Sequence, residues 1–569
     1  MTIHPFKIFA GGSTLNDTVP PVLLDCRGNA KKPSRECFAN LLKGAQSTGG
    51  HIMTPSRLSR RDIFRFGGGA LALNSISAAK GQPTKAMVRG RIINADDGSG
   101  LPSVRVSNGL DIALTGPDGE YALAYREHEP VFVIKPAGWS PELDEATLIP
   151  KFHANPSIAS SIDFALKPAI ERDDFRVLMF ADPQPGNDIE LGYLRTQLAN
   201  GLPESSAAFG ITLGDLVGDN LALFDRYNKI IGQIGLPWWN LPGNHDLDFS
   251  APSSMEARAP WRRAFGPTTY AFEYGMATFV MIDNINWHGK MKGPNPYSGM
   301  IGADNLSFIE SLLKTTPRDR LVVLCMHIPL ISACDPNDPG SNTSDRDALL
   351  ALIEGRPCVS FAGHMHTTEH HYLKLPKGGQ HHHHILTALS GSWWSGPIDA
   401  LGQPVAQSCD GSPNGWHILH VDGQDYSTEF VSTREMGKLR VMIVGDHQDG
   451  GVSTSRIETS SITQSALKSA KILVNVFDGG PRTRVEACVA GCSPSAMSRA
   501  VRPDPLTRDL FLRAGATKKP WVQAEPSSHI WQADLPSDLR AGSHRLNVYV
   551  RNEYGAPYHG ALIFEILEG

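Results

Sequence analysis

The sequence predicts an α/β sandwich in the middle of the chain, preceded by a small β-sandwich and followed by an all-β domain. In the middle of the chain, β-rich apolar runs end just before five residues: Asp182, Gly214, Gly243, His327 and Gly363. The segments between these runs have helical apolar spacing: 189–199, 222–235, 303–314 and 345–354. Strands joined through helices indicate an α/β sheet, whereas strand-like runs with few helical segments predict the two flanking domains.

The first 79 residues predict an export signal with a doubtful extension before it. The sequence SRRDIFR at 59–65 resembles a twin-arginine signal, and a short apolar stretch with a small-residue exit follows it. This stretch is too short for a transmembrane helix, which needs ~20 apolar residues. We therefore expect residues 1–52 to be a doubtful extension, with the true start at Met53, and residues 53–79 to be the signal peptide.

The predicted signal has a consequence for localisation. We expect the Tat export machinery to deliver the protein to the periplasm or the medium, with no part integral to the membrane. The alternative is a cytosolic protein with a chance pair of arginines.

The next region, residues 84–168, predicts a small β-sandwich. From Ala86 to Trp139 apolar and polar residues alternate between turns that contain Asp, Gly and Pro. A linker near 167–174 then leads into the first strand of the central region, which spans 172–430.

Polar clusters follow the five apolar runs of the central region. They are DPQ at 182–184, GD at 214–215, GNHD at 243–246, His327, and GHMH at 363–366. Because α/β sheets bind ligands beyond the carboxyl ends of their strands, we expect these clusters to meet in one crevice. Carboxylate, imidazole and amide donors brought to one point are what a two-metal hydrolytic site needs, with the metals ~3.5–4 Å apart.

These ordered clusters resemble those of the calcineurin-like metallophosphoesterases over roughly residues 172–430. The resemblance implies two divalent metal ions and assigns their ligands: Asp182, Asp215 and His366 for one metal, and Asp215, Asn244, His327 and His364 for the other. Asp215 would bridge the two. The turn order of residues 86–139 resembles the transthyretin-like or carboxypeptidase-regulatory-like modules that precede the catalytic domain in an exported bacterial branch of the family.

The resemblance also implies the reaction, which is hydrolysis of phosphomonoesters or phosphodiesters. A hydroxide that bridges the metals would attack phosphorus, and His245 would be the general acid that protonates the leaving alkoxide. Asp219 or Asp246 would orient His245.

The chain departs from the family pattern at two places. Gln184 stands where the first motif usually has His, so an amide oxygen replaces an imidazole at the first metal. Oxygen-rich ligands favour Mn²⁺ or Mg²⁺ over Zn²⁺, and we expect Mn²⁺, with iron as a further alternative. The sequence GDLVGDN at 214–220 lacks the continuation found in the cytosolic serine/threonine phosphoprotein phosphatases, which disfavours a dedicated protein phosphatase.

Downstream residues suggest how a substrate could be held. Trp393 and Trp394, with Asp410 and Asn414 in the following loop, suit a sugar, nucleobase or lipid headgroup joined to the phosphate, although tryptophan pairs also pack domains together. The run of histidines at 381–384 can direct at most two side chains at one site, because alternate residues of a strand face opposite sides.

The last region, 431–569, contains strand-like runs and predicts an all-β domain. A formal net charge of −5 gives no basic surface, so nucleic acid is excluded as an obligate partner, and the expected partner is a small phosphoester substrate. The sequence does not predict the oligomeric state. The alternative to an enzyme is a catalytically silent protein that binds envelope or glycan through a phosphoesterase core, which the presence of His245 disfavours.

Overall fold

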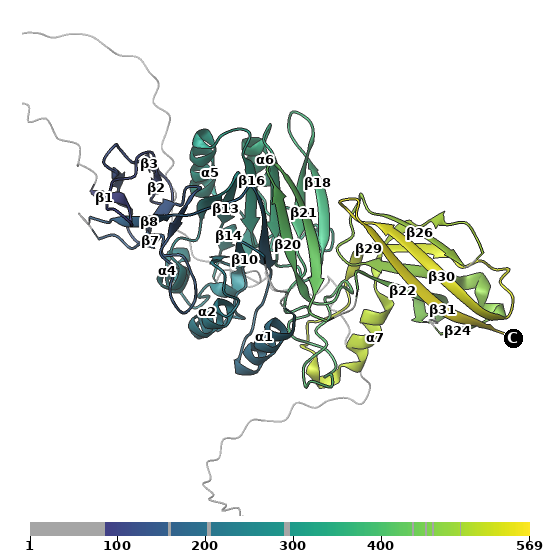
Figure 1. Cartoon of the computed structure of the whole chain (residues 1–569). Coiled ribbons are helices and arrows are strands. Elements are labelled where there is room, and N and C mark those ends of the chain that lie inside the picture. The colour runs from purple at the N-terminus through teal and green to yellow at the C-terminus, as the bar shows by residue number, and fades with distance from the viewer. Residues whose placement is uncertain are drawn as a thin grey trace, which may run out of the picture. The chain divides into compact units, whose positions relative to one another are not determined.

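The structure, a computed structural model, describes residues 86–157, 161–201, 206–289, 296–434, 437–449, 452–457, 460–489 and 491–568. The predicted extension and signal peptide, residues 1–52 and 53–79, lie outside the described residues. Within the described ranges, no helix is long and apolar enough to cross a membrane. Figure 1 labels many of the helices and strands.

Two four-stranded sheets form the N-terminal module. One has the order β4-β1-β8-β6: β1 (Met87–Asn94), β4 (Glu120–Ala124), β6 (Trp139–Pro141) and β8 (Phe164–Pro168). The other has the order β3-β2-β5-β7: β2 (Arg105–Ser107), β3 (Ile112–Leu114), β5 (Val131–Ile134) and β7 (His153–Ala154). The apolar side chains of this module join one continuous hydrophobic core with those of the central sheets, so the module packs as part of the central region.

Two mixed sheets form the central region (Figure 1). The five-stranded sheet has the order β11-β10-β9-β20-β21: β9 (Asp174–Phe180), β10 (Phe209–Leu213), β11 (Trp238–Leu241), β20 (Gly415–Asp422) and β21 (Asp425–Ser432). The six-stranded sheet has the order β12-β13-β16-β17-β19-β18: β12 (Tyr270–Tyr274), β13 (Ala277–Ile282), β16 (Leu321–Met326), β17 (Cys358–Ala362), β18 (Glu369–Lys374) and β19 (Gln380–Ile385). A separate ribbon pairs β14 (Ile285–Trp287) with β15 (Tyr297–Gly299).

Parallel pairing brings the ends of the key strands to common sheet edges. β9, β10 and β11 run parallel to one another, and so do β13, β16, β17 and β19. β13 and β16 are buried along their whole length, which explains their unbroken apolar sequences. The predicted crevice beyond the carboxyl ends of the strands therefore has a rigid, fully packed support.

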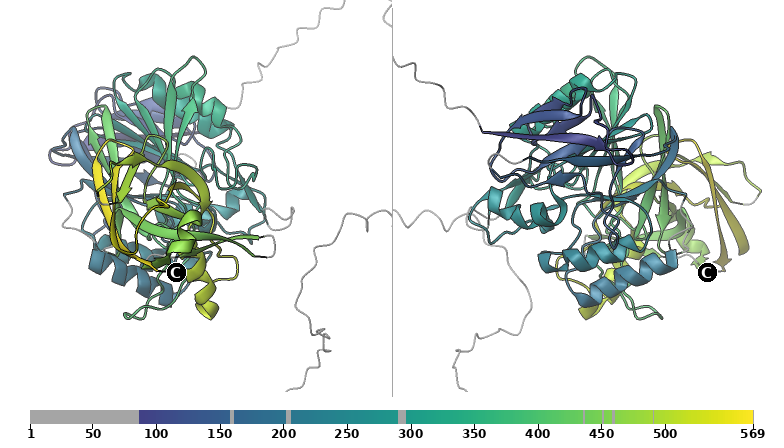
Figure 2. Two further views of the ribbon diagram at one scale, coloured as in Figure 1. Left: turned by 90° about the vertical axis from the view of Figure 1, so that its right-hand side faces the viewer. Right: turned by 60° about the vertical axis from the view of Figure 1, so that its left-hand side comes forward.

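The four segments with helical spacing are helices: α1 (Asp188–Gly201), α2 (Phe224–Gly232), α5 (Ala303–Thr315) and α6 (Arg346–Ile353). The predicted segment 222–235 also includes most of η1 (Leu221–Leu223). Three shorter elements were not predicted: η2 (Asn244–Asp246), α3 (Ser254–Ala257) and α4 (Ala259–Phe265). Helices α1 and α2 lie together below the central strands in Figures 1 and 2. The central region is thus the α/β sandwich that the sequence predicts.

Two five-stranded sheets form the C-terminal module. One has the order β23-β22-β25-β29-β28: β22 (Leu439–Asp449), β23 (Val452–Ile457), β25 (Ala470–Val476), β28 (Ser498–Pro503) and β29 (Pro526–Asp534). The other has the order β24-β31-β30-β26-β27: β24 (Ser461–Thr463), β26 (Arg484–Val489), β27 (Ser495–Ala496), β30 (Gly542–Arg551) and β31 (Pro557–Leu567).

The C-terminal module is β-rich as expected but also contains helical elements: η4 (Gln464–Ser469), α7 (Pro505–Arg513) and η5 (Gly515–Thr517). The prediction of an all-β domain missed α7. Its start has a physical cause, because the Asp504 side chain accepts hydrogen bonds from the N–H groups of Leu506 and Thr507, and Pro505 occupies the first helical turn.

Candidate metal centre

The polar clusters that follow the strands converge. The predicted ligands occur in this order: Asp182 and Gln184 after β9, Asp215 after β10, Asn244 after β11, His327 after β16, and His364 and His366 after β17. All of them are buried except His364, which is partly exposed. A cluster of charged and polar side chains buried to this degree requires partners of opposite charge or bound cations.

One group of ligand atoms surrounds Nε2 of His327. This nitrogen lies 3.0 Å from Oδ1 of Asn244, 3.2 Å from Nδ1 of His364 and 3.3 Å from Oδ1 of Asp215. Ligand atoms of Asp215, His327 and His364 all lie within 4.8 Å of one another. The structure therefore brings together the four residues predicted for the second metal.

A second group surrounds Nε2 of His366. This nitrogen lies 3.0 Å from Oε1 of Gln184 and 3.8 Å from Oδ1 of Asp182. The backbone N–H of His364 donates to both carboxylate oxygens of Asp182, at 3.0 and 2.9 Å, and so holds that carboxylate in place. Gln184 thus stands where the family pattern has a histidine, and its amide oxygen faces Nε2 of His366.

Hydrogen bonds to the backbone fix which ring nitrogens face the two groups. Nδ1 of His327 donates to the carbonyl of Leu213 at 2.8 Å, and Nδ1 of His366 donates to the carbonyl of Gly391. When the ring is neutral, each bond leaves Nε2 with a lone pair that faces the amide and carboxylate oxygens described above. Lone pairs that face one another at these distances repel unless a cation lies between them, so this donor set fits divalent metal ions.

The backbone of the site is strained. Positive φ angles, between 46° and 76°, occur at eight residues that were candidates: Asp182, Gln184, Asp215, Asp219, His364, His366, Trp393 and Trp394. Only five other non-glycine residues in the described part of the chain share this left-handed backbone. Such strain persists where the surrounding structure fixes it, typically at functional sites.

Two glycines allow the loops of the centre to approach each other closely. A Cβ atom at Gly243 would lie 2.1 Å from Oδ1 of Asp215, and one at Gly214 would lie 2.5 Å from Nδ1 of His327. Gly214 also has a φ of +86°. Glycine is therefore required in the GD and GNHD motifs because a side chain would displace the ligands themselves.

His245 lies beside the second group. Its backbone N–H donates to Oδ1 of Asp215 at 2.9 Å, and its ring Nδ1 bonds Oδ1 of Asp219 at 2.8 Å. The side chain of His245 is 32 % exposed, so the ring is accessible at the edge of the cluster. Of the two predicted carboxylates, Asp219 is therefore the one that contacts the His245 ring.

Asp246 has a different role. Its carboxylate accepts hydrogen bonds from the backbone N–H groups of Gly243, Leu216 and Val217, at 2.9, 3.1 and 3.2 Å. The prediction that Asp246 orients His245 is wrong, because its buried oxygens bind the backbone of the two ligand loops instead.

The buried charges shift one another's pKa. Burial raises the pKa of Asp182 to about 7. Burial also opposes ionisation of Asp215, but the charges of His327 and His245 hold the pKa of that carboxyl below its usual range. Burial disfavours protonation of His245, yet the charges of Asp215 and Asp219 outweigh it and raise the pKa to about 9. A cluster that shares protons in this way binds cations in competition with protons.

The two predicted tryptophans differ in their accessibility. Trp393 is partly exposed, and its ring stacks on the imidazole of His366 with the centroids 3.8 Å apart. Trp394 is buried, and its Nε1–H donates to the carbonyl of Pro183 at 2.9 Å. Trp393 therefore has an accessible ring next to His366, whereas Trp394 supports the loop that carries Gln184.

Asp410 and Asn414 are fully buried. Asp410 pairs with Nε2 of His529 in the C-terminal module at 2.9 Å, and the side-chain amide of Asn414 donates to Gln197 at 2.8 Å. The prediction that Trp394, Asp410 and Asn414 bind substrate is wrong, because their polar atoms are buried and bonded within the protein.

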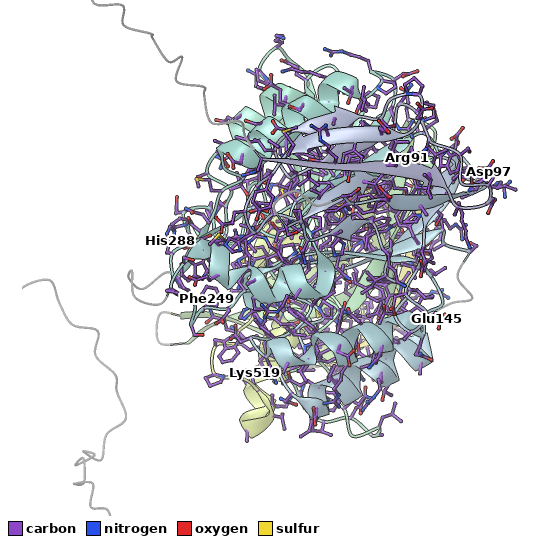
Figure 3. The ribbon with its side chains drawn as sticks, turned by 90° about the vertical axis from the view of Figure 1, so that its left-hand side faces the viewer. Arg91, Asp97, Glu145, Phe249, His288 and Lys519 are labelled. Atoms are coloured by element: carbon purple, nitrogen blue, oxygen red, sulfur yellow. The ribbon has the colours of Figure 1, made fainter. Side chains whose placement is uncertain are left out.

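The centre also has an aromatic edge, which the sequence pattern did not predict. The ring of Tyr297 in β15 meets His364 edge-on at 5.9 Å, and the ring of Phe249 lies 6.2 Å from Tyr297. Both residues are partly exposed, and Figure 3 labels Phe249 near His288 at one edge of the ribbon. Neither aromatic residue follows a core strand, so the pattern of strand ends gave no signal for them.

The C-terminal module also reaches this region. The ring of Trp521 meets Trp393 edge-on at 6.4 Å, and Nζ of Lys519 lies 5.9 Å from the centre of the Trp521 ring. Lys519 also pairs with Glu190 at 3.0 Å. These residues add an aromatic surface and a positive charge next to Trp393.

Comparison with known proteins gives matches over most of the chain. Three family models match: N terminal of Calcineurin-like phosphoesterase at residues 86–169, Calcineurin-like phosphoesterase at 175–368, and C terminal of Calcineurin-like phosphoesterase at 383–558. Among solved structures, the chain is similar to a purple acid phosphatase isolated from yellow lupin (Lupinus luteus) seeds, with 13% identity, a TM-score of 0.33, and coverage of 59% of this chain and 67% of that one. No curated protein matches the chain.

Proposed function

The chain belongs to the calcineurin-like phosphoesterases and is a metal-dependent phosphoric ester hydrolase, and from this membership we propose that it acts through a dinuclear centre. The proposed ligands are Asp182, Gln184, Asp215 and His366 for one cation, and Asp215, Asn244, His327 and His364 for the other. The convergence of electron-pair donors around Nε2 of His327 and Nε2 of His366 carries this proposal.

Divalent cations bound here would lower the pKa of a water molecule and offset the negative charge of the phosphoryl oxygens. The protein's own contribution is to hold the ligands rigidly, through strand ends and backbone hydrogen bonds that fix each imidazole. Manganese suits the amide and carboxylate oxygens of Gln184, Asp182 and Asn244, with iron, magnesium and zinc as the alternatives.

His245 is the proposed general acid. Asp219 accepts a hydrogen bond from Nδ1, and the charges of Asp215 and Asp219 together raise the pKa of the ring, which favours a protonated His245. When the ring is charged, its Nε2–H remains to protonate the departing alkoxide. His245 lies beside Asp215, and its partial exposure gives a leaving group access to this proton.

The proposed substrate is a small phosphomonoester or phosphodiester that carries an aromatic or sugar group. Trp393 and Trp521 offer ring faces next to His366, and Tyr297 offers a ring next to His364. Burial and the charge of Asp215 raise the pKa of Tyr297 well above its usual value, so its hydroxyl remains a hydrogen-bond donor.

Export is a further part of the proposal. The twin-arginine motif at 59–65 supports transport to the periplasm or the medium, which suits an enzyme that folds around its metals before it is exported. Replacement of both Arg60 and Arg61 by Lys should keep the activity in the cytoplasmic fraction. Equal export of the variant and the wild type would contradict this part.

Hydrolysis of two nitrophenyl substrates tests the mechanism. Metal-loaded protein is given p-nitrophenyl phosphate and bis-p-nitrophenyl phosphate, and the preferred ester defines the substrate class. We expect Mn²⁺-dependent activity that falls in the Asp215→Asn and His245→Ala variants. Full activity in Asp215→Asn, at a metal content equal to that of the wild type, would contradict the proposed centre.

A further inference from the structure

A second cluster of buried imidazoles joins the central sheets to the C-terminal module. Oδ1 of Asp478, which follows β25, lies 2.8 Å from Nε2 of His384, 3.2 Å from Nε2 of His370 and 3.7 Å from Nδ1 of His417. The three histidines come from β19, β18 and β20 and are all buried. None of these residues belongs to the metal centre described above.

The pairing of the strands directs two of these imidazoles to the same place. His370 and His384 lie directly opposite each other in the antiparallel pair of β18 and β19, and their rings stack with centroids 3.8 Å apart. Ligand atoms of His370, His384 and Asp478 all lie within 4.8 Å of one another. The sheet thus presents two imidazole nitrogens side by side to one carboxylate from the other module.

Within the described residues, one imidazole nitrogen that faces the Asp478 carboxylate has no hydrogen-bond partner. Nδ1 of His417 is buried and has no hydrogen-bond partner in the described part of the chain. Its Nε2 accepts a hydrogen bond from the backbone N–H of Thr387 at 3.3 Å, so Nδ1 carries the proton and faces Asp478 as a further donor. One carboxylate oxygen therefore faces three imidazoles.

The spacing matches that of ligands around a small cation. Bonds of ~2.0–2.1 Å to a tetrahedral zinc ion place neighbouring ligand atoms about 3.3 Å apart. The distances from Asp478 to His384 and His370, 2.8 and 3.2 Å, are close to this value. Two imidazoles and one carboxylate form a ligand set that zinc prefers.

A chain of hydrogen bonds orients one of these ligands from behind. Nδ1 of His370 bonds Nε2 of His382 at 2.9 Å, and Nδ1 of His382 bonds the Tyr426 hydroxyl at 2.9 Å. When His370 donates through Nδ1, its Nε2 presents a lone pair toward Asp478, as metal-bound histidines do.

We propose that His370, His384 and Asp478 bind a third metal ion, of which zinc is the best match, that fastens the C-terminal module to the catalytic sheet. The cluster is separate from the proposed catalytic centre, so the ion would have a structural role and take no part in hydrolysis. This proposal does not depend on the proposed catalytic mechanism.

Metal content tests the proposal. The full chain is loaded with Zn²⁺, dialysed and analysed for zinc per chain as wild type, His384→Gln and His381→Gln. His381 is the matched control because it is buried in the same strand but faces the other way, where it bonds Oγ of Ser360 at 2.7 Å. We expect His384→Gln to lose one zinc per chain and to unfold at a lower temperature, and His381→Gln to keep the zinc content of the wild type.

Equal zinc content in all three proteins would overturn the proposal. If His384→Gln does not fold, crystals of the zinc-loaded wild type decide the question through diffraction at the zinc absorption edge. An anomalous peak between His384 and Asp478 supports the site. Peaks at the catalytic centre alone would overturn it.

Discussion

Replacement of Asp219 by Asn separates the orientation of His245 from its chemistry. The hydrogen bond between the two side chains is 2.8 Å long, but the side chains of His245 and Asp219 are 32 % and 67 % exposed. Pairs this exposed contribute ~0.2–1 kcal/mol, because water screens them. Since ~1.4 kcal/mol corresponds to a tenfold change in rate, Asp219→Asn should lower kcat by about fivefold at most.

Removal of the imidazole itself should cost much more. General acids contribute ~10²–10⁴-fold, so His245→Ala should lower kcat by this factor for esters with an alkyl leaving group. The loss should be smaller for p-nitrophenyl esters, because p-nitrophenolate departs without help from an acid. The assay compares kcat of both variants on a p-nitrophenyl and a methyl ester of the same phosphate, with metal content measured for each protein.

Equal losses in the two variants, at unchanged metal content, would refute this reasoning. Asp219 would then do more than orient the ring. If the His245→Ala variant lost activity to a similar extent on both esters, His245 would not be the group that protonates the leaving group.

Three further predictions concern the metals, the loops and the aromatic residues. Gln184→His should increase the amount of metal that the protein retains after dialysis, since an imidazole replaces an amide oxygen. Unchanged retention, measured by elemental analysis, would contradict this prediction. Gly243→Ala should lower the metal content and should destabilise the fold by about 1–3 kcal/mol, because the new Cβ would lie 2.1 Å from Oδ1 of Asp215. A variant with the metal content of the wild type would contradict this prediction. Trp394→Ala should destabilise the fold by about 3–5 kcal/mol in urea unfolding. Trp393→Ala should raise KM for aryl esters with little effect on unfolding. Strong destabilisation by Trp393→Ala, together with a raised KM in Trp394→Ala, would disprove the assignment.

The sequence was sufficient to predict the central fold and the candidate ligands. Apolar runs such as those of β13 and β16 form strands that are buried on both faces. Such strands can be recognised from the sequence without knowledge of their packing. Because parallel strands of one sheet end at a common edge, the polar residues after the strands of each sheet had to lie close together. Gln184 after β9 and His366 after β17 belong to different sheets, so their approach to 3.0 Å depends on how the two sheets pack, which this rule does not predict.

Residues away from the strand ends were beyond this rule. Asp410 and Asn414 lie in a loop with the composition of a binding site, but contacts with distant segments bury them. Conversely, Tyr297 lies on a three-residue strand whose position depends on the ribbon with β14. Burial and proximity that arise from long-range packing are not encoded in local periodicity, and these are the properties that decide whether a polar or aromatic side chain contacts a substrate.

The two acidic candidates near His245 show how one motif can combine chemistry with loop closure. In the sequence, Asp246 is the obvious partner for His245 because the two are adjacent. Adjacent residues of the η2 turn point in different directions, however, and the Asp246 carboxylate turns inward to bind the backbone N–H groups of Leu216 and Val217. Asp246 thereby fastens the loop that carries Asn244 to the loop that carries Asp215, so the last residue of GNHD sets the geometry that the preceding two residues use.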